Sequence, residues 1–317
     1  MDTFYLMTQF AEPILFTLVT YYFDKEHFIT RYIKLVLFLA VVSLVFYVWG
    51  LADSAGLIHS GLLKEVEGLR ITYTKYYCNI FYALRPVELQ RNVGMFCEPG
   101  LYQIILNSGI YLLIFYPNRI DMKHKTITML ILLITSLTTL SATGIIGVII
   151  LIIGLLFSKN ESVKSNIKIV FILLLSIAVV YLFVDFAIKG SHSLIYTSLL
   201  GKIAGIKTSQ LTTGSVRILT IAWCLYLIFH NPLGYGLTYV NNFFASKGEY
   251  FVGAKILMTT AEVGVIPMFL IVRYFFEKAY KNRISNLQFY ILVFLFLNTA
   301  LAQSREFYPA LLMLLLL

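Results

Sequence analysis

The chain has 317 residues, of which 59% are hydrophobic and only 13% are charged, and its formal net charge is +9. This composition excludes an ordinary soluble domain and is typical of a protein that crosses a membrane several times. Because the apolar runs are continuous and do not alternate with a period of two residues, the spans are expected to be helices rather than barrel strands. We therefore predict an all-α, polytopic integral membrane protein that forms one domain over residues 1–317.

About nine apolar runs are the predicted membrane helices. They lie at residues 4–23, 33–51, 99–116, 126–140, 144–157, 169–188, 254–276 and 287–303, with a last one from about residue 307. We divide residues 126–157 into two short helices because they are too long for one span of about 20 residues and Thr143-Gly144 offers a tight reversal. The first run has no flanks typical of a signal peptide, so we expect a retained span. The last run reaches Leu317 without a polar flank, so we expect the native chain to be longer.

Basic residues concentrate in the short connectors between these runs. The four basic connectors are residues 24–32, 117–125, 158–168 and 277–286. Alternate crossings place all four on one side, which the positive-inside bias makes cytoplasmic. Two long loops then face outward: residues 52–98, and the larger loop 189–253, in which we expect short helices.

The chain carries no recognisable metal or nucleotide motif. Its three cysteines, Cys78, Cys97 and Cys224, lack metal-binding spacing. Cys78 and Cys97 share the first loop, where a disulfide is conceivable in an oxidising periplasm, although two unpaired thiols are the favoured state. No phosphate-binding loop, dinucleotide fingerprint, H-E-x-x-H or Asp-rich motif is found. We therefore expect no metal, no cofactor and no nucleic-acid partner, and ATP-driven transport and zinc hydrolysis lose support.

The stretch 214–264 combines charge with apolar sequence. Arg217 opens an apolar helical run, a Pro/Gly turn at 231–236 ends it, and Glu262 lies about eight residues into the next predicted span. Charge beside hydrocarbon is costly, and a buried carboxylate there should be protonated or paired. Most external cations are expected to meet lipid headgroups. Arginine nevertheless suits a pyrophosphate, because its planar fork donates two parallel hydrogen bonds. Arg91 and Arg217 are the best candidates, since each adjoins Gly- or Pro-rich backbone.

Three further residues are candidates for acid or base chemistry. Glu98 precedes Pro99 at the start of a predicted span, where it acts either as an anion favoured by the helix dipole or as a functional carboxylate. His230 is a candidate base by residue type, although a histidine alone in a loop is more often solvated. Glu249 is the only carboxylate of the second loop.

Several motifs occur in a characteristic order. R-x-x-G-x-F-x-E-P occupies residues 91–99, and T-S-L-T-T-L-S-A-T-G occupies residues 135–144. The third stretch contains R-x-x-x-x-x-W from Arg217 to Trp223, then N-P-L-G-Y-G at 231–236 and A-E-V-G at 261–264. Together they resemble the O-antigen ligase and polymerase superfamily of bacterial surface-polysaccharide assembly, and most of all the Wzy-type polymerases.

The resemblance implies a GT-C-like, inverting, metal-independent glycosyltransferase. It would join undecaprenyl-diphosphate-linked repeat units into O-antigen, capsule or exopolysaccharide at the periplasmic face of the bacterial inner (cytoplasmic) membrane. Arg91 and Arg217 would bind the diphosphate, and Arg217 would also assist its departure. The general base would be Glu98, Glu249, His230 or Glu262, in descending preference. Besides the lipid-linked glycan and the bilayer, the resemblance leaves room for a protein partner that regulates chain length.

Two departures from the family pattern bear on this interpretation. Where ligases usually carry His-Asn, nine residues before the Glu of E-x-G, this chain has Gly253 and Ala254, which argues against a ligase that transfers glycan to lipid A core. Ala142 stands where the family has an arginine, so one expected phosphate contact is missing. A transporter or flippase that uses intramembrane carboxylates is an alternative of another class, as is a non-catalytic assembly partner.

Overall fold

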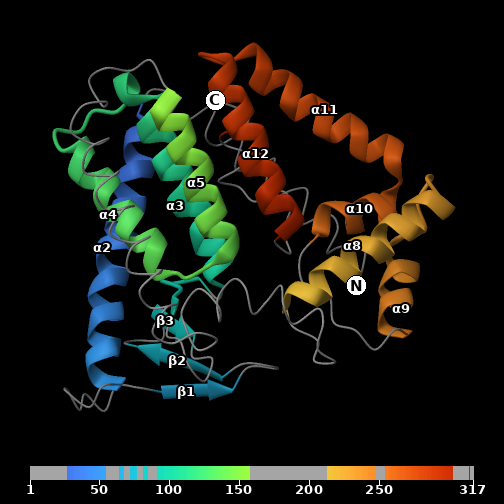
Figure 1. Ribbon diagram of the computed structural model, residues 1–317, viewed down its shortest axis with the longest axis horizontal. Coiled ribbons are helices and arrows are strands. Elements are labelled where there is room, and N and C mark those ends of the chain that lie inside the picture. The colour runs from blue at the N-terminus through green and yellow to red at the C-terminus, as the bar shows by residue number, and fades with distance from the viewer. Residues whose placement is uncertain are drawn as a thin grey trace, which may run out of the picture. The chain divides into compact units, whose positions relative to one another are not determined.

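The computed structural model describes residues 27–54, 64–67, 72–76, 81–84, 91–96, 98–157, 213–246, 254–302 and 314 (Figure 1). Most of these residues are helical, which confirms the predicted helical class. The chain divides into two compact units, Asp24–Lys164 and a second unit made of Met1–Phe23 with Ser165–Leu317. The spans expected at 4–23, at 169–188 and from about 307 lie outside the described residues, apart from Leu314.

Four helices form the described body of the unit Asp24–Lys164. They are α2 (Phe28–Ser54), α3 (Pro99–Phe115), α4 (Lys125–Thr138) and α5 (Ala142–Phe157), with a short 3-10 helix, η1 (Pro117–Arg119), after α3. Helix α3 contacts the other three helices, and its residues are almost all buried. A side chain at Gly109 would meet Leu132 of α4 at 3.1 Å and Val36 of α2 at 3.3 Å. Glycine therefore lets three helices approach closely at this level.

A small antiparallel sheet lies in the first long loop. Its strands follow one another in chain order: β1 (Lys64–Glu67), β2 (Thr72–Tyr76), β3 (Phe81–Leu84) and β4 (Arg91–Asn92). In β4, Arg91 pairs with Leu84 and Asn92 with Ala83. We had not predicted this sheet. Its strands are two to five residues long, so they give no signal in a search for membrane-length apolar runs.

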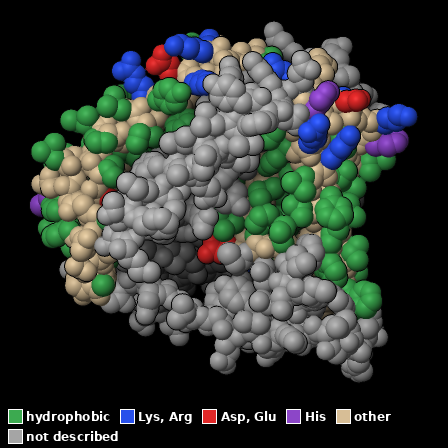
Figure 2. All heavy atoms as spheres, turned by 180° about the vertical axis from the view of Figure 1, so that it is seen from behind, with side chains coloured by type: hydrophobic (Ala, Val, Ile, Leu, Met, Phe, Trp, Pro, Cys, Tyr) green, Lys and Arg blue, Asp and Glu red, His purple; other side chains and the backbone are tan. Residues whose placement is uncertain are grey.

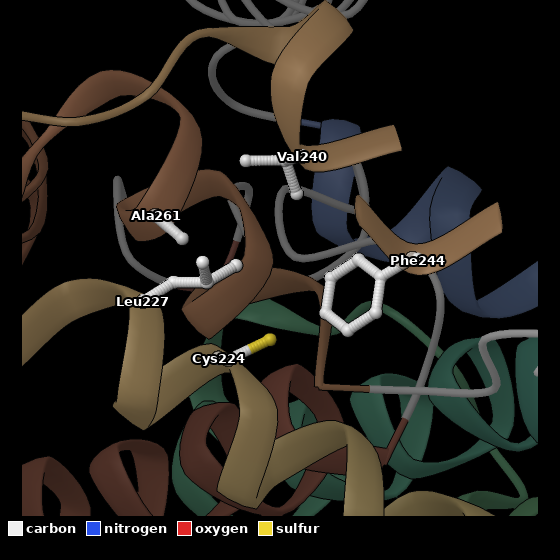
Figure 3. Packing of buried hydrophobic residues seen from close by; sticks show 5 residues of the cluster. All are labelled: Cys224, Leu227, Val240, Phe244 and Ala261. Atoms are coloured by element: carbon white, nitrogen blue, oxygen red, sulfur yellow. The ribbon is translucent and has the colours of Figure 1, made fainter. Parts of the chain in front are cut away.

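Five helices form the described part of the other unit. They are α8 (Thr213–His230), α9 (Leu237–Ser246), α10 (Lys255–Val263), α11 (Val265–Lys281) and α12 (Asn286–Ala302). Helix α10 contacts α8, α9, α11 and α12. Where α8, α9 and α10 meet, a core packs together (Figure 3), formed by Cys224, Leu227, Val240, Phe244 and Ala261.

The structure corrects one predicted span and refines another. Residues 254–276 do not form one helix, because the chain breaks at Gly264 between α10 and α11. Gly264 has φ 98° and ψ 160°, a backbone conformation essentially restricted to glycine. The division of residues 126–157 is confirmed, but the reversal lies at 139–141, where Leu140 has φ 47°, and Gly144 is already inside α5.

The remaining predicted spans within the described residues are helices whose ends differ by a few residues. They are α2, α3, α4, α5 and α12. Within the described part of the chain, one helix, Phe28–Ala52, has the length and hydropathy to cross a membrane, and the other apolar helices contain 10–17 residues. The predicted short helices of the second loop are represented by the 10-residue α9, whereas α8 has 18 residues.

Candidate functional site

Two glycine-rich turns dock on each other in the unit that contains α8 to α12. The turn after α8 and the break between α10 and α11 exchange three backbone hydrogen bonds: Tyr235 N–H to Ala261 O (2.9 Å), Gly236 N–H to Glu262 O (2.9 Å) and Val265 N–H to Pro232 O (2.8 Å). These turns are the N-P-L-G-Y-G and A-E-V-G motifs. The structure therefore brings together two motifs that lie about 30 residues apart in the sequence.

Glycine is required on both sides of this contact. A Cβ atom at Gly264 would lie 2.5 Å from the carbonyl oxygen of Leu233, and one at Gly234 would lie 2.6 Å from the backbone nitrogen of Gly264. Both glycines have positive φ angles, 98° and 93°. Asn231 closes the first turn with its side chain, since its Nδ2 donates to Gly234 O at 2.9 Å. The two backbones thus approach to a distance that no side chain would permit.

Glu262 is paired with a lysine that the sequence analysis did not single out. Lys255 Nζ lies 3.1 Å from Glu262 Oε1 and 3.5 Å from Oε2. The side chains are 12% and 2% exposed, respectively. The expectation that a buried Glu262 would be protonated or paired is therefore confirmed as a pair. Its position is corrected, because Glu262 is the second-last residue of the short helix α10 and is not inside a continuous span. A carboxylate held by an ammonium group is a poor general base, so Glu262 stays behind Glu98, Glu249 and His230 as a candidate.

Cys224 lies in the core beside this ion pair and is fully buried. Burial and, second, the charge of Glu262 raise the pKa of the Cys224 thiol to about 12, against a smaller opposite effect of Lys255. The thiol is therefore protonated at neutral pH and is a packing group rather than a nucleophile. Cys78 and Cys97 lie outside the described residues.

His230 is the last residue of α8 and is exposed. Its Nδ1 lies 2.9 Å from the carbonyl oxygen of Tyr226, and the two rings are 4.0 Å apart between centroids. Because a carbonyl oxygen only accepts, this hydrogen bond places the imidazole proton on Nδ1 and leaves Nε2 as the basic nitrogen. His230 therefore has a geometry that suits a base.

The second polar assembly belongs to the unit Asp24–Lys164 and contains strand β4. Asn92 is 2% exposed. Its Nδ2 donates to Ser43 Oγ of α2 at 3.3 Å and to Thr138 Oγ1 of α4 at 3.0 Å. Ser43 in turn bonds the hydroxyl of Tyr102 in α3, at 2.7 Å. This network joins the motif at 91–99 to the last turn of α4, where the motif at 135–144 begins. The sequence analysis assigned no role to any of its four polar residues.

A neighbouring network lies beneath the reversal between α4 and α5. Gln103 of α3 donates to Ser136 O and to Thr139 Oγ1, and Ser136 Oγ donates back to Gln103 Oε1 at 2.7 Å. Any side chain at Gly144 would collide with Gln103. Ser136 and Thr139 of the motif at 135–144 are therefore turned toward α3, and their bonds to Gln103 fix the reversal.

The structure describes four of the six predicted site residues at side-chain level. Glu98 is exposed and is the N-cap residue of α3, with no side-chain capping bond. Arg91 is half-buried in β4, and His230 and Glu262 lie as above. Arg217 lies in the second turn of α8, but its side chain is outside the described set, as is all of Glu249. Arg91 and Glu98 belong to one unit, and Arg217, His230 and Glu262 belong to the other.

In each unit, the motif residues and the basic connectors lie at opposite helix ends. Thr30 bonds both Arg119 O (3.3 Å) and the backbone nitrogen of Asp121 (3.0 Å), so the connectors 24–32 and 117–125 share one end of the bundle. Asn92 is bonded to Ser43, which lies 13 residues after Thr30 in α2, so it is about 20 Å away at 1.5 Å per residue, toward the other end of the bundle. The 17-residue α11 likewise separates Gly264 from the connector that carries Lys281. Figure 2 shows Lys and Arg side chains gathered at an end of each unit, beside hydrophobic side chains.

Among the described residues, no group of three or more His, Cys, Asp or Glu side chains lies close enough together to hold a metal ion. Comparison with known proteins gives no relative: no family model, no curated protein and no solved structure matches the chain. Function is therefore argued from the site and from the sequence motifs.

Proposed function

We propose that this protein is a multi-pass membrane glycosyltransferase that polymerises polyprenyl-diphosphate-linked repeat units into a bacterial surface polysaccharide. It acts at the outer face of the cytoplasmic membrane. One lipid-linked glycan is the donor and another repeat unit is the acceptor. The proposal rests on the resemblance of the sequence motifs, and the geometry of the described residues supports it in three ways.

The main observation in support of the proposal is that the motifs meet in pairs. The motif at 91–99 is hydrogen-bonded to the motif at 135–144 through Asn92 and Thr138. The turn at 231–236 is bonded to the turn at 261–264 by backbone groups. Motifs with a common function are expected to meet in space. In each unit they meet at the end opposite the basic connectors, which the positive-inside bias would make the outer end.

Exposed apolar stripes support the placement in a membrane. Helix α2 buries one face and exposes another apolar face, which includes Leu35, Phe38, Val45 and Val48 at 56–62%. Helix α12 exposes Tyr290, Phe294, Leu297 and Leu301, which recur at helical spacing. Contiguous apolar surface of this extent favours contact with lipid. The nine-span topology belongs to this proposal.

The chemistry divides among the candidate residues as follows. Arg91 and Arg217 hold the donor diphosphate and stabilise the negative charge that develops on it as the bond to the anomeric carbon breaks. The acceptor hydroxyl oxygen forms the new glycosidic bond, and its proton passes to a general base. With Glu262 paired to Lys255, the preferred candidates for that base are Glu98, Glu249 and His230. Polyprenyl diphosphate leaves.

Replacement of Arg217 tests the proposal. With Arg217→Ala as the only copy of the gene, we expect single repeat units on the cell surface, since removing one donor from a site of developing charge lowers rates by about 10²–10³-fold. Gel analysis of surface glycan gives the chain-length ladder, and immunoblotting gives the amount of protein in the membrane. Arg273→Ala is the matched control, because Arg273 is an exposed arginine of α11 whose side chain is 65% exposed.

A wild-type ladder from Arg217→Ala would remove this residue from the site. The deletion strain separates the rival functions. Lipid-linked polymer that accumulates without reaching the surface indicates a ligase, and repeat units stranded on the cytoplasmic leaflet indicate a flippase. Externally exposed single units indicate a polymerase.

A further inference from the structure

Residues 92–94, near the end of the first long loop, are buried against the helical bundle. Asn92 is 2% exposed and Val93 is fully buried. The loop thus carries its arginine, Arg91, immediately before a segment that packs like core. Burying a polar side chain such as that of Asn92 is costly unless all its groups are bonded.

Every polar group of the Asn92 side chain has a partner. Its two N–H groups are directed to the hydroxyls of Ser43 and Thr138, and its oxygen accepts from Gly94 N–H at 3.1 Å. The hydroxyl protons are already committed elsewhere, because Ser43 donates to Ala40 O at 2.9 Å and Thr138 donates to Thr135 O at 2.7 Å. Both hydroxyls therefore act as acceptors toward residue 92, and only a side chain with two donors satisfies them.

Tyr102 of α3 packs against the same segment. Its ring stacks on Phe96 with 5.3 Å between centroids. A Cβ atom at Gly94 would lie 3.0 Å from the ring, and Gly94 has φ 56°. The Tyr102 hydroxyl reaches Ser43 Oγ at 2.7 Å and Leu39 O at 3.3 Å. The segment 91–96 is thus held at three points: the amide of Asn92, the close approach of Gly94 to Tyr102, and the ring of Phe96.

This anchoring fixes the backbone from which Arg91 projects. Arg91 is bonded to Asn92 and also pairs with Leu84 in the sheet. A fixed backbone reduces the entropy that the loop loses when Arg91 binds a ligand. Displacing a binding group by about 1 Å can lower a reaction rate by about 100-fold.

We infer that Asn92 is a positioning residue that holds Arg91 for contact with the diphosphate of the lipid-linked substrate. This inference rests on the proposed function. Asn92 itself contacts only the protein, and it acts through the backbone of the residue before it. The sheet holds this segment through the pairing of Arg91 with Leu84, and the Asn92 side-chain amide bonds it to α2 and α4.

The anchoring is tested by electron paramagnetic resonance of a nitroxide attached to Arg91→Cys, in a variant whose Cys78 and Cys97 are serines. With Asn92 present, we expect an immobilised spectrum. Asn92→Ala removes all three bonds, and Asn92→Asp keeps the volume but faces two acceptors, so both should add a fast-motion component. Asn107→Ala is the matched control, because Asn107 is also a buried asparagine of this bundle, 8% exposed, but lies outside the network.

Glycan ladders of the same substitutions, made with Arg91 in place, test the link to the substrate. We expect Asn92→Ala, Asn92→Asp and Arg91→Ala to shorten the ladder at unchanged protein level, with Asn107→Ala like wild type. If Asn92→Ala is degraded, Ser43→Ala removes one acceptor and gives the same comparison.

Two results would overturn the positioning role: an unchanged nitroxide spectrum in both Asn92 variants, or an equal gain in mobility with Asn107→Ala. A third result separates the anchoring by Asn92 from the diphosphate role of Arg91. Greater mobility at position 91 together with wild-type ladders for Arg91→Ala and both Asn92 variants would overturn the diphosphate role of Arg91 while the anchoring stands. Loss of the ladder in the Arg217 variant alone would then leave the proposed function intact.

Discussion

The described α8 to α12 unit contains a buried ion pair, Lys255–Glu262. Removing one partner leaves an uncompensated buried charge, which costs about 3–5 kcal/mol, whereas replacing both partners with apolar or neutral groups is often tolerated. We therefore expect Glu262→Gln and Lys255→Met each to lower the unfolding temperature of the detergent-solubilised protein sharply. The double variant should recover most of the loss, and the double-mutant cycle measures the coupling between the two residues.

The exposed pair Lys281–Glu277 provides the control for that cycle. Its nitrogen and oxygen lie 2.7 Å apart, but the side chains are 70% and 50% exposed. Solvent screens such pairs, so Glu277→Gln should hardly change the unfolding temperature. Equal effects of Glu277→Gln and Glu262→Gln would show that the burial of the Lys255–Glu262 pair is not what gives it its strength.

Residue roles were predictable from sequence only where local chemistry sufficed. A carboxylate in an apolar run must be neutral or paired, so the pairing of Glu262 could be foreseen. Its partner Lys255 lies seven residues earlier in the same helix, a spacing of two turns that would have found it. Asn92 could not be found in this way, because its partners are 46 and 49 residues distant. Such a network exists only once the helices have packed.

At the scale of elements, the two docked turns determine how α10 and α11 follow α8. Gly264→Ala places a Cβ atom 2.5 Å from the backbone oxygen of Leu233, and backbone cannot move aside cheaply. The φ of 98° adds strain of about 1–3 kcal/mol for a residue other than glycine. We expect Gly264→Ala to separate the turns and reduce the amount of folded protein, measured by fluorescence-detected size-exclusion chromatography.

Gly236→Ala isolates the contribution of backbone strain. Gly236 has φ 80°, but a Cβ atom there meets nothing within 4 Å. The variant should therefore retain more folded protein than Gly264→Ala, since it carries strain without the collision. If the two variants lose equal amounts, the close approach of the turns is not what requires Gly264.

The break at Gly264 also shows which elements hydropathy can and cannot reveal. The runs that became α2, α3, α4, α5 and α12 were found because apolar side chains accumulate along each of them. Residues 254–276 are less apolar than these runs but still mostly apolar, so hydropathy joined α10 and α11 into one span. The break depends on one positive φ angle and on contact with a turn 30 residues earlier, neither of which average hydropathy records. The strands of the first loop were missed for another reason, since at two to five residues they are too short for a search for membrane-length apolar runs.

At the scale of the whole molecule, each unit by itself has a motif end and a basic end. In the unit Asp24–Lys164, the bond of Thr30 to Arg119 O gathers two basic connectors at one end, and Asn92 lies at the other. In the second unit, α11 runs from the docked turns to the basic connector at 277–286. The separations are about 20 Å along α2 and about 26 Å along α11, against a hydrocarbon thickness of about 30 Å. Under the proposed function, a membrane lies between the motif end and the basic end of each unit.

Four variants, each with one added cysteine at an exposed position, test this arrangement, two in each unit. Met95→Cys and Leu233→Cys mark the motif ends, and Asn118→Cys and Asn282→Cys mark the basic ends. With the cysteines of the first loop replaced by serine, we expect a membrane-impermeant maleimide to label the first two in intact spheroplasts and the last two only after lysis. Buried Cys224 should stay unlabelled, because burial keeps its thiol protonated and inaccessible. If both members of a pair react equally in intact spheroplasts, no membrane separates the ends of that unit, and labelling in the reverse order would place the arginine-bearing motifs in the cytoplasm, where a polymerase of externally displayed units cannot act.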